Sequence, residues 1–192
     1  MNKKRLEAFS DGVIAILITI MVLQLQMPRG ADWTDLVPVI PIFLSYVLSF
    51  VFLGIYWNNH HHMLQATDHV DGRVLWANMH LLFWLSLIPF TTSWMSLHFG
   101  NASVTLYGID LLFAALAYYL LERTILAHTD SNNTLRQAIG RDIKGKASVA
   151  LYLLAVASAS FDTWVSIGIY ILIALMWLVP DRRIERAIGH RH

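Results

Sequence analysis

The sequence has no cysteine and little charge, and both shortages limit what the protein can be. Without cysteine the chain cannot form disulfides, thiolate metal sites or cysteine nucleophiles. Charged residues make up 14% of its 192 residues, whereas a typical soluble domain has about 25%. The formal net charge is only +1, which gives no basis for binding nucleic acid. We therefore expect a single domain, residues 1–192, whose main solvent and partner is the lipid bilayer.

Hydrophobic residues make up 56% of the chain and gather in long runs. A helix needs about 20 mostly apolar residues to cross a bilayer. The expected spans are residues 9–27, 36–56, 74–97, 104–121, 147–161 and 164–179. The fold class that they predict is an all-α membrane protein with six transmembrane helices. No small-x-small cleavage site follows the first run, so we expect it to be retained and not removed as a signal peptide.

The lysines and arginines predict the orientation of these spans. If both termini are cytoplasmic, every lysine and arginine except Arg29 falls on the inner side of the membrane. Short inner loops of membrane proteins carry this kind of excess positive charge. An odd number of spans would destroy the asymmetry. We therefore expect a multi-pass integral membrane protein, located in a cytoplasmic-type membrane such as the bacterial cell membrane.

The first span carries one nearly uninterrupted apolar stripe. At about 100° per residue, the residues of this stripe fall within about 60° of one line, with Gln26 at its edge: Arg5, Phe9, Gly12, Ile16, Thr19, Ile20 and Leu23. Such a stripe can face lipid or line a pore. The lack of an aromatic residue after Phe9 and the hydroxyl of Thr19 in mid-stripe do not decide between these alternatives.

The same helix begins with a recognisable motif. The pattern Arg5-x-x-x-Phe9-Ser10-Asp11, followed by Thr19, resembles the signature of the transmembrane protein 175 family of potassium channels. Three further segments resemble parts of its second, third and last helices: Trp57 to His61, Asn78 with Leu87 to Thr91, and Pro180 to Arg183. The resemblance thus extends over essentially the whole chain.

This resemblance implies a potassium-permeable homotetramer in which four copies of the first helix line the pore. Ile16 would form the narrowest ring, with Ile20 and Leu23 above it, while Thr19 would favour potassium and Gln26 would lie at the outer mouth. No TVGYG-type selectivity loop is present. A ring of isoleucines offers no oxygens to replace an ion's water, so it can gate by dewetting and select modestly for the more weakly hydrated potassium ion over sodium.

A second group of residues would support the pore helix from behind. By the same resemblance, this signature and packing network comprises Arg5, Phe9, Ser10, Asp11, His60 and His61. The three consecutive histidines from His60 to His62 point in directions about 100° apart on a helix, so they cannot all bind one ion. The H-x-x-x-H spacing of a helical zinc pair is absent. We therefore expect no resident metal and no cofactor, only permeant potassium.

Asp110 leaves an alternative function open. An ionisable residue inside a span is a candidate functional group, although a structural bond to a tyrosine or asparagine would also explain it. The alternative is a proton-coupled or secondary transporter that uses Asp110 and buried histidines. A membrane protein with no transport role is the third possibility. An enzyme is not expected, since the chain has no G-x-S-x-G motif and no nucleophile placed beside a base.

Overall fold

The structure is a computed structural model that describes residues 2–65, 70–127 and 143–178. Within these residues it contains six α-helices, one 3-10 helix and no strand: α1 (Lys3–Leu23), η1 (Trp33–Val39), α2 (Ile40–Gln65), α3 (Gly72–Leu97), α4 (Asn101–Ala127), α6 (Ile143–Ser158) and α7 (Thr163–Leu178). The prediction of an all-α chain is confirmed. The motif from Pro180 to Arg183 and most of the polar connection at 128–146 lie outside the described residues.

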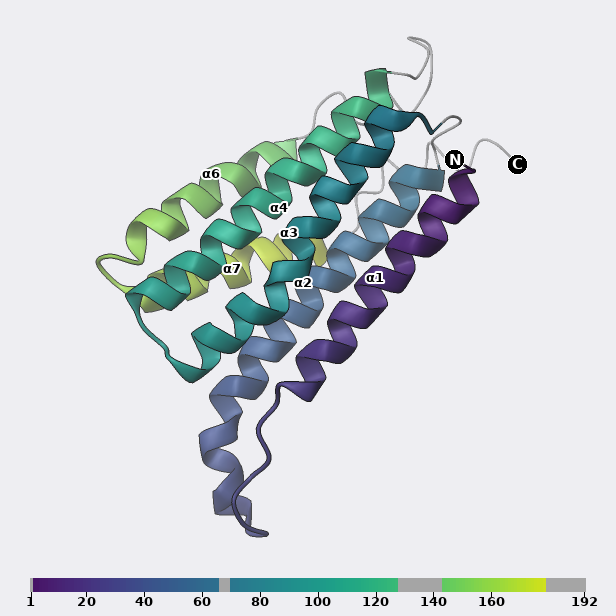
Figure 1. Ribbon diagram of the computed structural model, residues 1–192. Coiled ribbons are helices and arrows are strands. Elements are labelled where there is room, and N and C mark those ends of the chain that lie inside the picture. The colour runs from purple at the N-terminus through teal and green to yellow at the C-terminus, as the bar shows by residue number, and fades with distance from the viewer. Residues whose placement is uncertain (1, 66–69, 128–142, 179–192) are drawn as a thin grey trace.

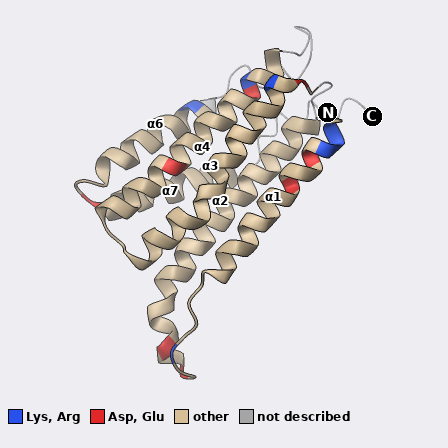
Figure 2. Cartoon of the chain, viewed as in Figure 1, with Lys and Arg blue, Asp and Glu red and all other residues tan. Residues whose placement is uncertain are grey.

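Four of these helices are long and apolar enough to cross a membrane: α1, η1 continued by α2, α3 and α4. α6 and α7 have 16 residues each, which is shorter than a standard span. Figure 2 shows charged residues gathered toward the ends of the bundle, with one acidic residue in the middle of α4. Apart from this acidic residue, the long middle section of the helices is uncharged and matches the hydrocarbon core of a bilayer.

The ends of α1 differ from the expected span of residues 9–27. The side chain of Asn2 accepts a hydrogen bond from the backbone N–H of Lys4, so this cap starts the helix at Lys3. The helix ends at Leu23, and Gln26 lies in the irregular segment before Pro28, a residue that a helix interior does not tolerate. The helical stripe that the sequence predicts therefore does not extend to Gln26.

The helix α2 also extends beyond its expected inner end, residue 56, to Gln65. The added segment holds the polar residues from Trp57 to His62, and several of them have partners on α1 and α3. A span predicted from apolar residues alone leaves this segment out. The segment is helical nonetheless, because its polar groups find partners on neighbouring helices. At the other end, Pro41 occupies the first turn of α2, where proline is tolerated.

The helices form a bundle in which α1 lies at one edge (Figure 1). α1 packs against α2 and α3, which also pack against each other, and α3 packs against α4. α6 lies on the side of α4 away from α1, and α7 packs against α6, α2 and α4. The buried side chains Leu81, Leu85 and Ile88 place α3 in the core. As an edge helix, α1 has one face against the bundle and one face away from it.

Candidate functional site

The inner face of α1 fastens it to the bundle. Its buried residues recur every three or four positions: Leu6, Ser10, Ile14, Leu17 and Met21. This spacing puts them on one side of the helix, against α2 and α3. The direction in which every other side chain of α1 points is set by this buried face.

The opposite face of α1 holds the predicted pore stripe. Ile16, Ile20 and Leu23 are 57%, 39% and 82% exposed, so the described part of the chain leaves them uncovered. Phe9 and Gly12, nearer the N-terminus on the same stripe, are exposed as well. The stripe is therefore available to lipid or to further copies of the subunit.

Thr19 is exposed in the middle of this stripe. Its hydroxyl donates a hydrogen bond to the backbone carbonyl of Ile16, at an Oγ1 to O distance of 2.8 Å. Because the only proton of the hydroxyl is used within the helix, its oxygen lone pairs remain as acceptors toward the uncovered side. A cation moving along the stripe would meet an oxygen at this level.

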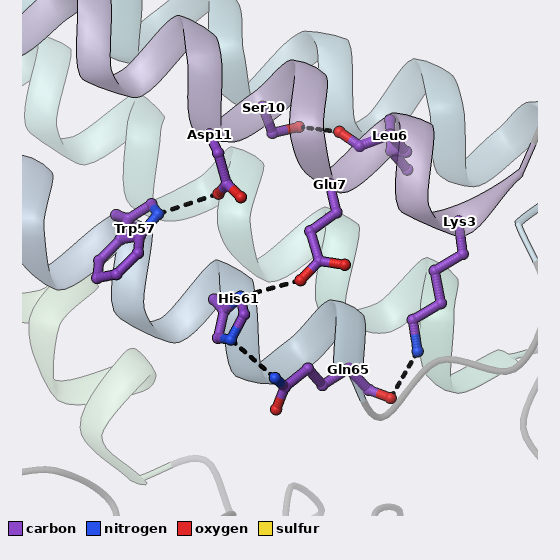
Figure 3. Close-up of polar contacts among 8 residues, drawn as sticks. All are labelled: Lys3, Leu6, Glu7, Ser10, Asp11, Trp57, His61 and Gln65. Carbon is purple, nitrogen blue, oxygen red and sulfur yellow. Dashed lines mark hydrogen bonds and ion pairs between the residues drawn. The ribbon is translucent and has the colours of Figure 1, made fainter.

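A ladder of polar contacts joins α1 to α2 (Figure 3). Nζ of Lys3 donates to the carbonyl oxygen of Gln65 at 2.7 Å, and Oε1 of Glu7 lies 2.9 Å from Nδ1 of His61. On the next turn, Nε1 of Trp57 donates to Oδ1 of Asp11 at 3.0 Å. Residue numbers rise by four along α1 as they fall by four along α2. Residues four apart share a helix face, so two antiparallel ridges meet rung by rung.

A buried chain of hydrogen bonds joins α1, α2 and α3. Ser10 donates to the carbonyl of Leu6 at 2.9 Å, so its oxygen accepts from Nδ2 of Asn78 at 3.0 Å. Oδ1 of Asn78 must then accept from Nε2 of His60, which lies 2.7 Å away. The side chains of Ser10, His60 and Asn78 are completely buried. In such surroundings an unpaired polar group is costly, so each member of the chain depends on the others.

These contacts include part of the predicted packing network. Ser10 is connected to His60 through Asn78. Asp11 accepts a hydrogen bond from Trp57, which lies one turn from His61 on the same face of α2. Arg5 and Phe9 are exposed instead, and the guanidinium of Arg5 forms no polar contact with any residue that the structure describes. The two residues lie on the side of the uncovered stripe.

Sequence reasoning missed several members of the ladder. It assigned no role to Glu7 or Gln65 and no polar partner to Trp57, although all three take part. The signal was present in the spacing, because Lys3, Glu7 and Asp11 follow one another at four-residue intervals. The same interval separates Trp57, His61 and Gln65 on α2.

Asp110 lies in the interior of the bundle and is only 2% exposed. Its Oδ2 accepts a hydrogen bond from Oγ1 of Thr91 at 2.9 Å. The partner is therefore a threonine, and not the expected tyrosine or asparagine, because α4 packs along α3 at this level. Among the described residues, no hydrogen bond joins Asp110 to a histidine. The arrangement resembles a hydrogen bond between two packed helices more than it resembles a proton relay.

The sequence is similar to those of known potassium channels. The family model described as endosomal/lysosomal potassium channel TMEM175 matches residues 5–89, which contain α1, α2 and most of α3. A potassium channel of Chryseobacterium sp. (strain P1-3) is 50% identical over 189 residues, 98% of each chain. A potassium channel of Streptomyces collinus (strain DSM 40733 / Tue 365) is 31% identical over 131 residues, 63% of this chain and 64% of that one.

The fold is similar to a solved structure. The crystal structure of a lysosomal potassium-selective channel TMEM175 homolog from Chamaesiphon minutus superposes with a TM-score of 0.79 at 26% sequence identity. The match covers 93% of this chain and 97% of that chain. The similarity thus includes the whole arrangement of helices and extends well beyond the segment around α1.

Proposed function

The chain belongs to the TMEM175 family of potassium channels, and we propose that it conducts potassium ions passively across a bacterial membrane. The observation that carries this proposal is the 50% identity to a potassium channel over 98% of both chains. The helical bundle, with its apolar helices and TMEM175-like fold, supports a multi-pass integral membrane protein. Permeation makes and breaks no covalent bond, so the proposal assigns no catalytic residue.

We further propose that four copies assemble around an axis lined by α1. The anchored and uncovered faces of α1 support this arrangement, because the contacts to α2 and α3 turn Ile16, Ile20 and Leu23 away from the subunit's own core. A stripe that only faced lipid would explain the exposed aliphatic residues. The tetramer would in addition give the Thr19 hydroxyl oxygen on that stripe a role, since it would face the ions. Gln26, beyond the end of α1, would lie at the outer mouth.

The proposed constriction works by dehydration. A ring of Ile16 side chains gives a passing ion no oxygen ligands, so the ion has to give up part of its water or wait until the ring widens. Potassium loses water more easily than sodium, which favours it modestly. Thr19 lies one helical turn farther along and presents its hydroxyl oxygen. We propose that Ile16 controls access and that Thr19 adds to the preference for potassium.

The transporter alternative receives less support. It would need Asp110 and the histidines to form one polar site near the middle of the membrane. Asp110 is instead bonded to Thr91, while His60 is bonded to Asn78 in a separate group. The two functions also predict different kinetics, since a channel gives flux that does not saturate at moderate ion concentration.

The role of Ile16 can be tested by ion flux from purified protein in liposomes, with potassium and sodium gradients compared. Ile16→Asn places a polar side chain in the ring, so we expect a higher flux and weaker discrimination between the two ions. Ile16→Met fills the ring further, so we expect a lower flux. Val22→Asn is the matched control, because Val22 is an exposed aliphatic residue of α1 that lies off the stripe. Unchanged flux in both Ile16 variants would refute the assignment.

A further inference from the structure

One cluster of metal-binding side chains plays no part in the proposed ion pathway. We propose that Glu7, Asp11 and His61 bind a divalent ion of the zinc class, which fastens α1 to α2. One ligand atom from each of the three residues lies within 4.8 Å of the others. Figure 3 shows the three side chains converging between the two helices. This carboxylate–histidine cluster is distinct from the predicted stripe, and its ability to bind metal does not depend on potassium permeation.

The positions of the ligands follow from helix geometry. Glu7 and Asp11 are one turn apart on α1, so both carboxylates extend from the same face. His61 meets them from α2, with its Nδ1 2.9 Å from Oε1 of Glu7. That nitrogen forms no hydrogen bond of acceptable geometry with any described residue. A zinc ion lies about 2.0–2.2 Å from each nitrogen or oxygen ligand. To bind it, the Glu7–His61 pair would separate slightly and any ligand pair near the 4.8 Å limit would close, which side-chain rotation allows.

The residues around the cluster hold the ligands in place. Nε1 of Trp57 donates to Oδ1 of Asp11 and leaves the second carboxylate oxygen for an ion. On the other side, Nε2 of His61 lies 2.8 Å from the side-chain amide of Gln65. With metal on Nδ1, the imidazole proton is on Nε2, and the Gln65 amide can turn its oxygen to accept it. Outer contacts of this kind orient the ligands of established metal sites.

Charge and access also suit a divalent cation. Two carboxylates face one imidazole, and Nζ of Lys3 is bonded to a backbone carbonyl and not to either acid. The side chains of His61 and Glu7 are 32% and 20% exposed, so the described residues leave an opening to them. A mixed nitrogen and oxygen ligand set favours zinc-like ions over calcium or magnesium, which prefer oxygen alone. A bound ion would replace the direct Glu7–His61 contact in the ladder and would also join Asp11 to His61.

The test is metal binding to the full-length protein, purified with a tag that contains no histidine and stripped of metal. Titration calorimetry with zinc chloride at neutral pH should show one saturable site per chain, and cobalt(II) should give the visible absorption of a tetrahedral nitrogen and oxygen site. Zinc should also raise the midpoint of thermal unfolding, since a ligand that binds only the folded state stabilises it. Magnesium and calcium should compete weakly.

Glu7→Gln and His61→Asn should each weaken zinc binding by at least about tenfold. Both residues are partly exposed, so these variants should fold, which circular dichroism and the metal-free unfolding midpoint will check. His98→Asn is the matched control, because His98 is an exposed histidine at the end of α3, outside the cluster. The proposal is overturned if the unaltered protein binds no zinc at micromolar concentrations, if both cluster variants bind it as well as the control, or if calcium binds more tightly than zinc.

Discussion

Thr19 is the residue to which we assign the ion preference of the proposed pore. Its proton is committed to the carbonyl of Ile16, and its oxygen is left among aliphatic neighbours on the uncovered side of α1. A threonine bonded back to its own helix costs little stability. In the proposed tetramer, four such oxygens would form the single polar level between the rings of Ile16 and Ile20.

Replacing Thr19 by valine should therefore change selectivity more than conductance. Valine keeps the shape of the side chain and removes the oxygen, so the ratio of potassium to sodium permeability should fall toward one. Thr19→Ser retains the oxygen and should keep most of the preference. Reversal potentials in planar bilayers under mixed ion gradients measure this ratio. A Thr19→Val channel that discriminates like the unaltered protein would remove Thr19 from the selectivity mechanism.

Asp110 allows the channel and transporter interpretations to be separated at the scale of one residue. Asn keeps an oxygen that can accept the hydrogen bond from Thr91, but it cannot carry a proton through a transport cycle. We expect Asp110→Asn to retain potassium flux within about twofold, with little change in unfolding temperature, because the contact costs only about 1 kcal/mol if it is weakened. Loss of flux in a folded Asp110→Asn protein would favour a proton-coupled transporter.

At the scale of the helices, α1 is positioned by two separate sets of contacts. The ladder joins its polar face to α2, and the buried chain through Ser10 and Asn78 joins it to α3 as well. Both sets lie in the N-terminal half of the helix, while Ile16, Ile20 and Leu23 lie in the other half. Among the described residues, hydrogen bonds to neighbouring helices thus hold the first half of α1, whereas only apolar packing holds the half that carries the proposed pore stripe. Apolar packing permits small shifts that hydrogen bonds resist, so this arrangement suits a gate that moves slightly.

The contact between α4 and α7 depends on a glycine. The hydroxyl of Tyr170 lies directly over Gly108 and donates to the carbonyl oxygen of Val104 at 3.1 Å. A Cβ atom at Gly108 would lie 2.7 Å from Cζ of Tyr170, so the ring would have to move. Since both residues are buried, no open space is available for that movement.

Gly108→Ala should therefore destabilise the bundle by about 1–3 kcal/mol, the usual cost of overpacking. The thermal unfolding midpoint of the protein in detergent should fall accordingly. Gly168→Ala is the matched control, because nothing lies within 4 Å of its added Cβ and alanine is the better helix former. Adding Tyr170→Phe to Gly108→Ala should restore part of the loss, since it removes the colliding hydroxyl. An unfolding midpoint equal to that of the Gly168 variant would contradict this packing.

At the scale of the whole molecule, one subunit leaves an apolar face of α1 uncovered. Exposed aliphatic side chains are common on any membrane protein, where lipid covers them. The proposed assembly covers this particular face with its own symmetry mates. The absence of cysteine makes the assembly accessible to experiment, because a single introduced cysteine is the only thiol in the chain.

Ile16→Cys should form covalent dimers with a short bifunctional thiol reagent in dilute proteoliposomes, because the ring brings two of its copies close together. Leu154→Cys is the control: Leu154 is 59% exposed on α6, which lies on the far side of the bundle from α1. It should remain monomeric. The intact complex should have the mass of four subunits by native mass spectrometry. Dimers through Leu154 but not through Ile16 would place the axis elsewhere.

The sequence determined the class of this protein and the location of its candidate pore. Long apolar runs predict all-α membrane architecture, because each run satisfies its backbone hydrogen bonds internally wherever its neighbours lie. The stripe from Phe9 to Leu23 could be found for the same reason, since the angle between residues of one helix is fixed by local geometry. The motif from Arg5 to Asp11 was enough to suggest the family. The cytoplasmic location of the termini stays a prediction from charge.

Only the tertiary structure decided which residues meet. Glu7 faces His61, Asp11 faces Trp57, and Asn78 connects Ser10 to His60, although these partners are far apart in the chain. It also gave Asp110 a threonine partner. The physical reason is that a helix fixes directions around its own axis but not its rotation or offset relative to a neighbour. Those two quantities depend on the packing of all the helices together, and they set every contact between α1 and the rest of the bundle.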